Sequence, residues 1–460
     1  MEHSNTVIIN PRRFQSFCFR GEGRANFVIS AKSKDSGLRI VWRLAKHRKS
    51  GTVTVNPKCQ VVVAYLEKLI VPILERNYLV QPKIIRIDVQ ALHNIAKIPS
   101  LPLNMKVETY DELCDVTKFP SSLSSFPLTG LPKNITHICA LEMPDATEIP
   151  KHLRLHCSGS TVTVEIKPKQ GFFQKNCGIN IPYCNNCVLQ LEKCSSDAFD
   201  RMYDYCPLDL FSGDLERMLR AIRSLIIVPH RNLRIFLDGT VIHSDEIPLE
   251  LEQLEQILFN DGSITVEQLT TALCCILAGS PSDEGFFFHD TSVLGSLLNA
   301  QRYDTIGIMR AYQIYTSLPV DKQKELLDKC LLPRKGLSFL EKADPVALVE
   351  KYLFAATMKD CSIMISLRLL DAFSSEDSYA FDNSQQIVRV SIPDSTTPMF
   401  SNTGRHQSAN SCLPASFAYS IKIVDLDPKS PKNLLNGYDR FMRGVKLVEE
   451  SKNLRRPCIC

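Results

Sequence analysis

The chain has 460 residues, which is long enough to bury a large core and to form more than one lobe. Its 44% hydrophobic and 23% charged residues are typical of a soluble globular protein, without the long apolar run of a transmembrane helix. The net charge of +4 is too small to identify a partner, and the first residues lack a secretory signal pattern. The 17 cysteines therefore indicate reduced thiols in the cytoplasm or nucleus.

Positive charge is concentrated near the N-terminus, where residues 1–50 hold eleven Lys and Arg but three acids. This suits nucleotide phosphates or nucleic acid, with a solvated basic surface as the alternative. Residues 14–30 predict two strands joined by a hairpin that contains Gly21 and Gly23. The backbone could approach a phosphate there, although many hairpins use glycine only for its conformational freedom.

The rest of the first lobe is predicted from its apolar patterns. We expect a strand over 38–44, a helix over 59–76, a loop over 117–133 and another strand over 135–141. That last strand leads into Glu142 and Met143. The junction could be an inter-lobe hinge whose backbone binds adenine, or a plain strand-to-turn junction.

The stretch 163–173 places an acid and two lysines at every second residue. In an extended chain Glu165, Lys167 and Lys169 would line one face, with neighbouring charges about 7 Å apart. Such a row suits a ligand with several phosphates, and the alternative is a solvated edge strand. Pro168 predicts that the strand frays or lies at an edge.

A group of cysteines follows, at positions 177, 184, 187 and 194. Cys184 and Cys187 have the spacing of half a zinc site, but Cys177 and Cys194 are too far from this pair in the sequence to form a second pair of the same kind. The sequence leaves open whether this group binds metal or consists of small buried residues on a helix. The terminal Cys458-Ile-Cys460 resembles a prenylation tail and is interpreted as coincidental.

The second half of the chain is predicted to be mostly helical over 245–358, with a mobile polar insertion over 373–414. Asp360 precedes an apolar strand, where its carboxylate could face a cleft or simply occupy a turn. Asp425 and Asp427 follow a strand over 417–423. Paired carboxylates suit Mg²⁺, although such pairs are also common on surfaces.

Five segments, in this order, resemble those of the inositol-pentakisphosphate 2-kinase family. They are the glycine loop at 21–26, Glu-Ile-Lys-Pro-Lys at 165–169, Pro-Leu-Asp-Leu-Phe-Ser-Gly at 207–213, Lys-Asp-Cys-Ser-Ile-Met-Ile at 359–365 and Asp-Leu-Asp-Pro-Lys at 425–429. The resemblance implies an α+β, two-lobed kinase-like fold, with an N-terminal lobe over 1–145, a C-terminal lobe over 146–460 and ATP in a cleft between them. It also implies transfer of the γ-phosphoryl group of ATP, with Mg²⁺, to the 2-hydroxyl of inositol 1,3,4,5,6-pentakisphosphate, giving inositol hexakisphosphate.

The resemblance implies roles for single residues as well. Asp360 would orient the attacking hydroxyl and accept its proton, and Lys167 would bind the transferring phosphate. Asp425 would bind Mg²⁺, assisted by Asp427. The nucleotide would be bound by Gly21, Glu22, Gly23, Arg24, Ala25, Asn26, Arg43, Glu142, Met143, Glu165 and Arg234. The substrate would be bound by Lys169, Lys193, Arg231, Asn232, Lys429 and Tyr438.

One segment departs from the family's pattern. Asn185 and Leu189 stand where the family has Arg and His, and only Lys193 is kept. Loss of the arginine removes a bidentate phosphate contact. An inositol phosphate kinase of altered isomer specificity and a non-catalytic inositol polyphosphate-binding protein therefore remain alternatives. An RNA-binding protein ranks last because clustered aromatic residues are lacking. We expect a monomer without a membrane or nucleic-acid partner.

Overall fold

The computed structural model describes residues 7–22, 26–45, 57–88, 106–113, 115, 137–175, 178–196, 204–258, 264–329, 331–370, 386–391, 415–450 and 455–458. The chain divides into two compact units. Unit 1 comprises Met1–Pro72, Leu79–Ala146 and Leu332–Gly336, and unit 2 comprises Ile73–Tyr78, Thr147–Leu331 and Leu337–Cys460. Strands and helices are mixed in the chain, which confirms the α+β class. Within the described ranges, no helix is both long and apolar enough to cross a membrane.

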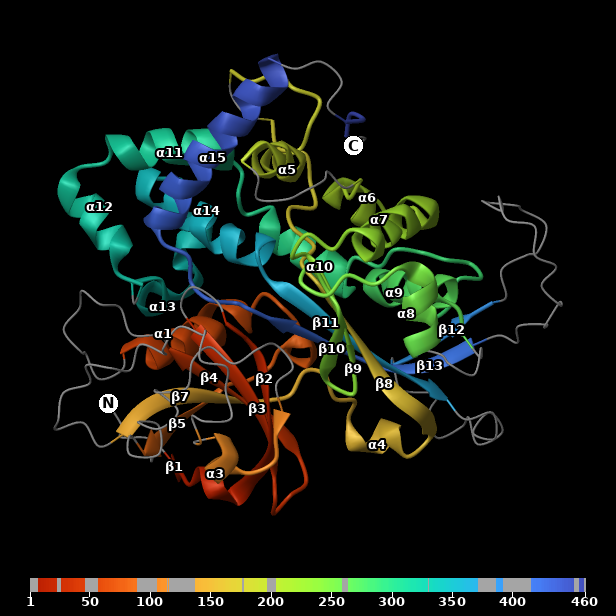
Figure 1. Cartoon of the computed structure of the whole chain (residues 1–460). Coiled ribbons are helices and arrows are strands. Elements are labelled where there is room, and N and C mark those ends of the chain that lie inside the picture. The colour runs from red at the N-terminus through yellow and green to blue at the C-terminus, as the bar shows by residue number, and fades with distance from the viewer. Residues whose placement is uncertain are drawn as a thin grey trace. The chain divides into compact units, whose positions relative to one another are not determined.

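Unit 1 is built on a sheet with the strand order β1-β5-β7-β4-β3-β2-β6 (Figure 1). Its strands are β1 (Val7–Ile9), β2 (Phe14–Glu22), β3 (Asn26–Ser33), β4 (Arg39–Ala45), β5 (Lys83–Asp88), β6 (Lys106–Val107) and β7 (His137–Pro144). The predicted helix is α1 (Pro57–Tyr65), which continues as the π-helical turn η2 (Leu66–Ile70). Phe17, Ile29 and Trp42 form the centre of a buried apolar cluster on this sheet.

The strand expected to end at Leu141 continues through Pro144 as β7, so the junction with the following turn lies three residues later than predicted. β4 pairs with it along this whole stretch, up to the pair Ile40–Pro144. Glu142 and Met143 therefore lie within a paired strand, and the prediction that the strand ends before them was wrong.

Unit 2 is built on an antiparallel sheet with the order β10-β9-β8-β11-β13-β12 (Figure 1). Its strands are β8 (Cys157–Ile166), β9 (Leu233–Leu237), β10 (Thr240–His243), β11 (Ser362–Leu370), β12 (Ile387–Val390) and β13 (Ala415–Val424). β8 lies between β9 and β11, and its Val162, Val164 and Ile166 are buried. The alternative of a solvated edge strand was therefore wrong.

Unit 2 also contains most of the described helices. They are α4 (Lys151–Arg154), α5 (Asn185–Ser195), α6 (Pro207–Leu210), α7 (Leu215–Ile227), α8 (Leu251–Leu258), α9 (Val266–Ala278), α10 (Val293–Gln301), α11 (Gly307–Ser317), α12 (Val320–Leu327), α14 (Pro345–Lys359) and α15 (Pro431–Glu450). α13 (Leu331–Lys335) falls largely in unit 1. The predicted helical region 245–358 is thus confirmed. α5 packs along α15, and α15 along α11, around a second buried cluster that includes Val188 and Phe441.

The polar stretch 373–414 contains a strand that the sequence interpretation missed. Ile387–Val390 forms β12 and pairs with β13, so the prediction of an insertion without regular structure was wrong there. Val388 and Val390 are buried and alternate with more exposed neighbours, as expected for a strand with one covered face. Most of the remaining stretch lies outside the described residues.

Candidate active site

Three neighbouring antiparallel strands of the unit 2 sheet place the predicted catalytic residues at the same end of the sheet, where these strands begin or end. Ile363 of β11 pairs with Ile166 of β8, and Ser362 pairs with Val424 of β13. The C-terminal ends of β8 and β13 therefore adjoin the N-terminal end of β11. Lys167 directly follows β8, Asp360 lies two residues before β11, and Asp425 directly follows β13, so all three lie at this end of the sheet.

The charged side chains at this end of the sheet form a cluster of ion pairs. Asp360 is bound by two lysines: Lys169 Nζ lies 3.1 Å from Oδ1, and Lys429 Nζ lies 2.5 Å from Oδ2. Lys167 Nζ lies 3.6 Å from Asp425 Oδ2. The Asp360 and Asp425 side chains remain 50% and 47% exposed, so both carboxylates are accessible to a ligand.

The backbone of this segment differs from the predicted extended row. β8 ends at Ile166, and the Lys167 N–H then donates to the Asn232 carbonyl at 2.8 Å. Lys169 has φ +63°, which breaks the two-residue alternation, so the prediction of a continuous strand face was wrong. Arg231 and Asp425 also have positive φ, and such strain is concentrated at functional sites in many proteins.

The lysines determine the charge state of the carboxylate at the centre. Burial raises the pKa of Asp360, but Lys169, Lys429 and Lys167 outweigh it and hold this pKa well below its ordinary value. Burial lowers the pKa of Lys167, whereas Asp425, Glu165 and Asp360 raise it above its ordinary value. Asp360 is therefore a carboxylate and Lys167 an ammonium group at neutral pH.

Glu165 and Arg234, two of the predicted nucleotide residues, lie directly beside Lys167. They face each other across the β8–β9 pair. Ser362 Oγ donates to Glu165 Oε1 at 2.8 Å, which fixes the carboxylate. Glu165 raises the pKa of Lys167 because its negative charge stabilises the ammonium group, whereas Arg234 lowers this pKa by repulsion.

A further cation, Lys193 of α5, belongs to the same electrostatic environment. Burial, followed by Lys169, Arg440 and Arg231, lowers the pKa of Lys193 to about 8, although Asp360 opposes this. Arg231 is 76% exposed and lies 3.4 Å from Asp245. Lysines and arginines that repel one another in this way are suited to a ligand with several negative charges.

Sequence interpretation missed Arg440 as a member of this cation group. It lies on α15, and its Nε and Nη2 donate to Glu192 of α5 at 3.2 Å. In the sequence it is one of several charges on a long helix, so no local signal identifies it.

The loop that carries Lys169 is held in place by a second residue that sequence interpretation missed. Gln301 is fully buried at the end of α10. Its Nε2 donates to the Lys169 carbonyl at 2.8 Å, and its Oε1 accepts from Gly171 N–H at 2.8 Å. Tyr205 Oη donates to the Pro168 carbonyl at 2.7 Å. The loop is thus bound on several sides by neutral hydrogen bonds.

Three other predicted substrate and metal residues, Tyr438, Asn232 and Asp427, contact neighbouring segments of unit 2. Tyr438 stacks on Tyr312, with ring centroids 3.6 Å apart and planes at 6°. Asn232 is buried, and the Asp427 carbonyl accepts from Thr357 Oγ1 at 3.1 Å. Of the three, Asn232 adjoins the cluster, because its carbonyl accepts the Lys167 N–H.

The predicted nucleotide residues of unit 1 lie on its central strands. Gly21 and Glu22 end β2 and pair with Val28 and Phe27, whereas Gly23, Arg24 and Ala25 lie outside the described residues. Asn26 begins β3, and Arg43 is a half-buried residue of β4 paired with Val28. Glu142 Oε2 accepts a hydrogen bond from Trp42 Nε1 at 3.0 Å, and Met143 pairs with Val41.

Comparison with known proteins identifies relatives over most of the chain. The family described as inositol-pentakisphosphate 2-kinase matches residues 19–440. An Arabidopsis thaliana protein named inositol-pentakisphosphate 2-kinase is 27% identical over 396 residues, which is 81% of this chain and 85% of the relative. A Danio rerio protein of the same name is 25% identical over 425 residues, or 76% and 82% of the two chains. A Drosophila melanogaster protein of that name is 31% identical over 150 residues, or 26% and 24%.

Proposed function

Because the chain belongs to the inositol-pentakisphosphate 2-kinase family, it is an ATP-dependent kinase of inositol pentakisphosphate, and we propose that the cluster around Asp360 is its active site. The observation that carries this proposal is the meeting of Lys167, Lys169, Lys429, Asp360 and Asp425 at one end of the sheet. Phosphoryl transfer depends on positioning and charge neutralisation, and this cluster offers both.

The substrate explains the number of cations. Five phosphomonoesters carry a charge of about −8 to −10 at neutral pH, taking about −1.5 to −2 for each. Lys169, Lys193, Lys429 and Arg231 supply positive charge for such a ring at neutral pH, and Arg440 adds to it. In the absence of substrate, Asp360 partly neutralises Lys169 and Lys429.

Substrate binding would therefore change the state of Asp360. Phosphate groups that bind Lys169 and Lys429 would replace the carboxylate as their partner. Its pKa would then rise toward the ordinary range, because the lysines hold it low. We propose that Asp360, released in this way, orients the 2-hydroxyl and accepts its proton as the phosphoryl group is transferred.

Lys167 and the two acids after β13 are proposed to act on the nucleotide. Lys167 would bind the transferring phosphate. Asp425, with Asp427, would bind Mg²⁺, because carboxylate oxygens together with phosphate oxygens are the ligands this hard cation prefers. The metal would neutralise charge on the phosphates. Units 1 and 2 are proposed to correspond to the two lobes of a kinase-like fold, with Arg43 and Asn26 of unit 1 and Arg234 of unit 2 binding ATP.

A second candidate is a kinase with a different isomer preference. Asn185 Nδ2 lies 3.4 Å from Gln170 Oε1, and Leu189 packs against the apolar cluster around Val188. Neither can supply the charge that the family's Arg and His provide. Fewer cations at this end of α5 would weaken discrimination between substrates that differ in the position of one phosphate.

The test is to incubate the purified protein with Mg-ATP and each of several inositol tetrakis- and pentakisphosphate isomers, and to separate the products by charge. The proposed activity predicts inositol hexakisphosphate from the 1,3,4,5,6 isomer. Faster turnover of another isomer would favour the second candidate. Tight binding of these compounds without any ATP-dependent product would contradict the assignment of the cluster as an active site.

A further inference from the structure

The segment Pro-Leu-Asp-Leu-Phe-Ser-Gly at 207–213 is one of the five that carry the family resemblance, and the proposed site assigns a role only to the other four. It forms α6 and the turn after it. Asp209 at its centre has a side chain that is only 1% exposed. A carboxylate buried this deeply cannot reach a substrate, so any contribution to the reaction must act through other residues.

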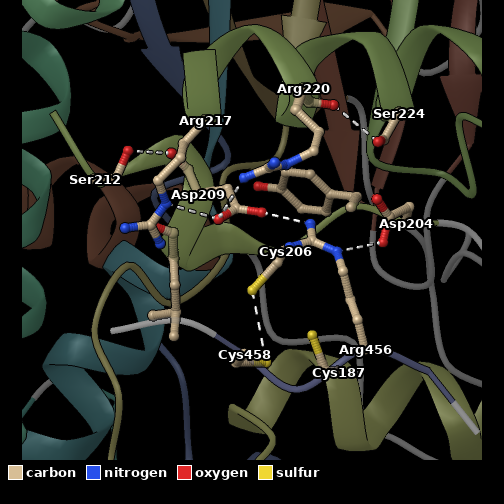
Figure 2. Close-up of polar contacts among 12 residues, drawn as sticks. Cys187, Asp204, Cys206, Asp209, Ser212, Arg217, Arg220, Ser224, Arg456 and Cys458 are labelled. Atoms are coloured by element: carbon tan, nitrogen blue, oxygen red, sulfur yellow. Dashed lines mark hydrogen bonds and ion pairs between the residues drawn. The ribbon is translucent and has the colours of Figure 1, made fainter. Parts of the chain in front are cut away.

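Arginines from two distant parts of the chain hold Asp209. Arg217 Nε of α7 lies 3.0 Å from Asp209 Oδ1, and Arg456 Nη2 lies 2.7 Å from Oδ2. Figure 2 shows Asp209 between these two guanidinium groups, with Arg220 Nη2 3.7 Å from Oδ1. Arg456 Nε also lies 2.8 Å from Asp204 Oδ1. A buried carboxylate is costly unless such partners surround it, so these contacts fix the backbone between the two acids.

The segment that carries Arg456 is itself anchored in unit 2. The Cys458 N–H donates to the Pro182 carbonyl at 2.8 Å. Four cysteine sulfurs lie within 4.8 Å of one another here, those of Cys184, Cys187, Cys206 and Cys458. Of the cysteines that the sequence analysis placed near the Cys184–Cys187 pair, Cys194 is not in this group, and Cys177 lies outside the described residues. Arg456 is therefore a fixed partner for Asp209.

Tyr205 connects this ion-pair cluster to the loop after β8. It lies between the two acids that Arg456 binds, and it is fully buried. Its Oη donates to the Pro168 carbonyl at 2.7 Å. The segment 207–213 supports the same loop a second time, because the ring of Phe211 packs directly on the backbone of Gly171.

The hydrogen bond from Tyr205 acts on the residue of the loop that has the least common backbone conformation. Lys169 has φ +63°, which residues other than glycine adopt only where their surroundings determine it. The carbonyl before Lys169 accepts from Tyr205, and the carbonyl of Lys169 itself accepts from Gln301 at 2.8 Å. Both peptides that flank Lys169 are thus held. This conformation places its ammonium group 3.1 Å from Asp360.

We propose that Tyr205 and Asp209 are positioning residues of the kinase site. Asp209 and its arginines fix Tyr205, and Tyr205 fixes the peptide that sets the direction of Lys169. Without the Tyr205 hydroxyl, Lys169 can relax to an ordinary backbone conformation, and its ammonium group then leaves the place where a substrate phosphate binds. The inference rests on the proposed function of Lys169 and assigns the segment 207–213 its role.

The first test needs neither substrate nor turnover. Tyr205→Phe removes one hydroxyl group and keeps the buried ring. Hydrogen–deuterium exchange followed by mass spectrometry should show exchange about tenfold faster in peptides covering residues 167–175, because one buried hydrogen bond is lost. Tyr315→Phe, at a buried tyrosine of α11, is the matched control and should leave this loop unchanged. Wild-type exchange of the loop in Tyr205→Phe would overturn the proposal.

The second test asks whether Tyr205 acts through Lys169. Calorimetry should show that Tyr205→Phe weakens the binding of inositol pentakisphosphate about tenfold. In a Lys169→Gln protein the same substitution should change the affinity less than about twofold, because the group that it positions is already lost. Equal losses in both backgrounds, or lower stability with wild-type affinity, would show that Tyr205 has a structural role only.

Variants of the ion-pair cluster extend the test to Asp209. Asp209→Asn leaves its arginines without a charged partner and is expected to lower stability strongly. Arg456→Gln keeps the pair of Asp209 with Arg217, so it should fold and weaken binding about threefold, with faster exchange in the same loop. Wild-type exchange and affinity in Arg456→Gln would overturn the role of the cluster. Wild-type protein that does not bind the pentakisphosphate would contradict the proposed function, whereas loop exchange would still decide whether Tyr205 positions Lys169.

Discussion

Lys193 is a residue whose charge can change within the working pH range of the protein. Burial and neighbouring cations lower its pKa to about 8, so it is an ammonium group below this pH and neutral above it. A polyphosphate binds the charged form, and binding therefore takes up a proton above pH 8. We expect the affinity for inositol pentakisphosphate to fall as the pH rises from about 7.5 to 9.

Calorimetry in buffers of different ionisation enthalpy would measure both the affinity and the proton uptake. The phosphates lose their second proton near pH 6, so the ligand's charge is nearly constant over this range. Lys193→Arg keeps its charge at these pH values and should remove most of the pH dependence. Wild-type affinity that is constant across the range would show that Lys193 does not contact the substrate.

At the scale of an element, the loop after β8 depends on Gln301. The buried side-chain amide of Gln301 donates a hydrogen bond to the Lys169 carbonyl and accepts one from the Gly171 N–H. Gln301→Leu keeps the approximate size but leaves these backbone groups without a partner, which costs about 1–3 kcal/mol for each unsatisfied group. We expect lower unfolding free energy in denaturant titrations and a higher KM for inositol pentakisphosphate. Gln313→Leu, at an exposed position of α11, should change neither.

Gly171 allows the same loop to pack closely on the segment after α6. A Cβ atom at this position would lie 2.4 Å from Cγ of the Phe211 ring, so one of the two segments must move. Gly171→Ala should destabilise the protein by about 1–3 kcal/mol. In a double-mutant cycle with Phe211→Ala, which removes the ring, the penalty of the alanine should largely disappear. Additive effects of the two substitutions would contradict this packing.

At the scale of the whole molecule, the net charge of +4 is small compared with that of the substrate. The attraction must therefore come from the local cation group, and salt should screen it. We expect the logarithm of the affinity to fall steeply with ionic strength, and Lys429→Gln to reduce that slope. Lys446→Gln, an exposed position of α15, is the matched control and should keep the wild-type slope.

The sequence predicted those parts of the molecule that depend on local patterns. The strand that carries Glu165, the helices from α8 to α14 and the strand before Asp425 follow from apolar periodicity and Pro or Gly breaks, but the end of the first strand at Ile166 was not predicted. The α+β class was confirmed on this basis, and the family was confirmed by comparison. Such patterns carry information over a few residues to a few turns, which is sufficient to find elements.

The parts that could not be predicted depend on tertiary pairing. Gln301 and Arg440 act on residues far away in the chain, and nothing in their own neighbourhood marks them. Cys206 and Cys458 join Cys184 only because the C-terminal segment returns to α5. β12 is four residues long within a polar stretch, and it forms because β13 offers a partner.

The most direct measurement of the central claim compares wild-type protein with Asp360→Asn for both turnover and binding of inositol pentakisphosphate. Asp360 pairs with two lysines that are proposed to bind phosphate, so removing its charge frees them while removing the group that accepts the proton. We predict loss of turnover to about 10⁻² of wild type or less, with substrate affinity equal or higher. Turnover close to wild type in a correctly folded Asp360→Asn protein would contradict the account.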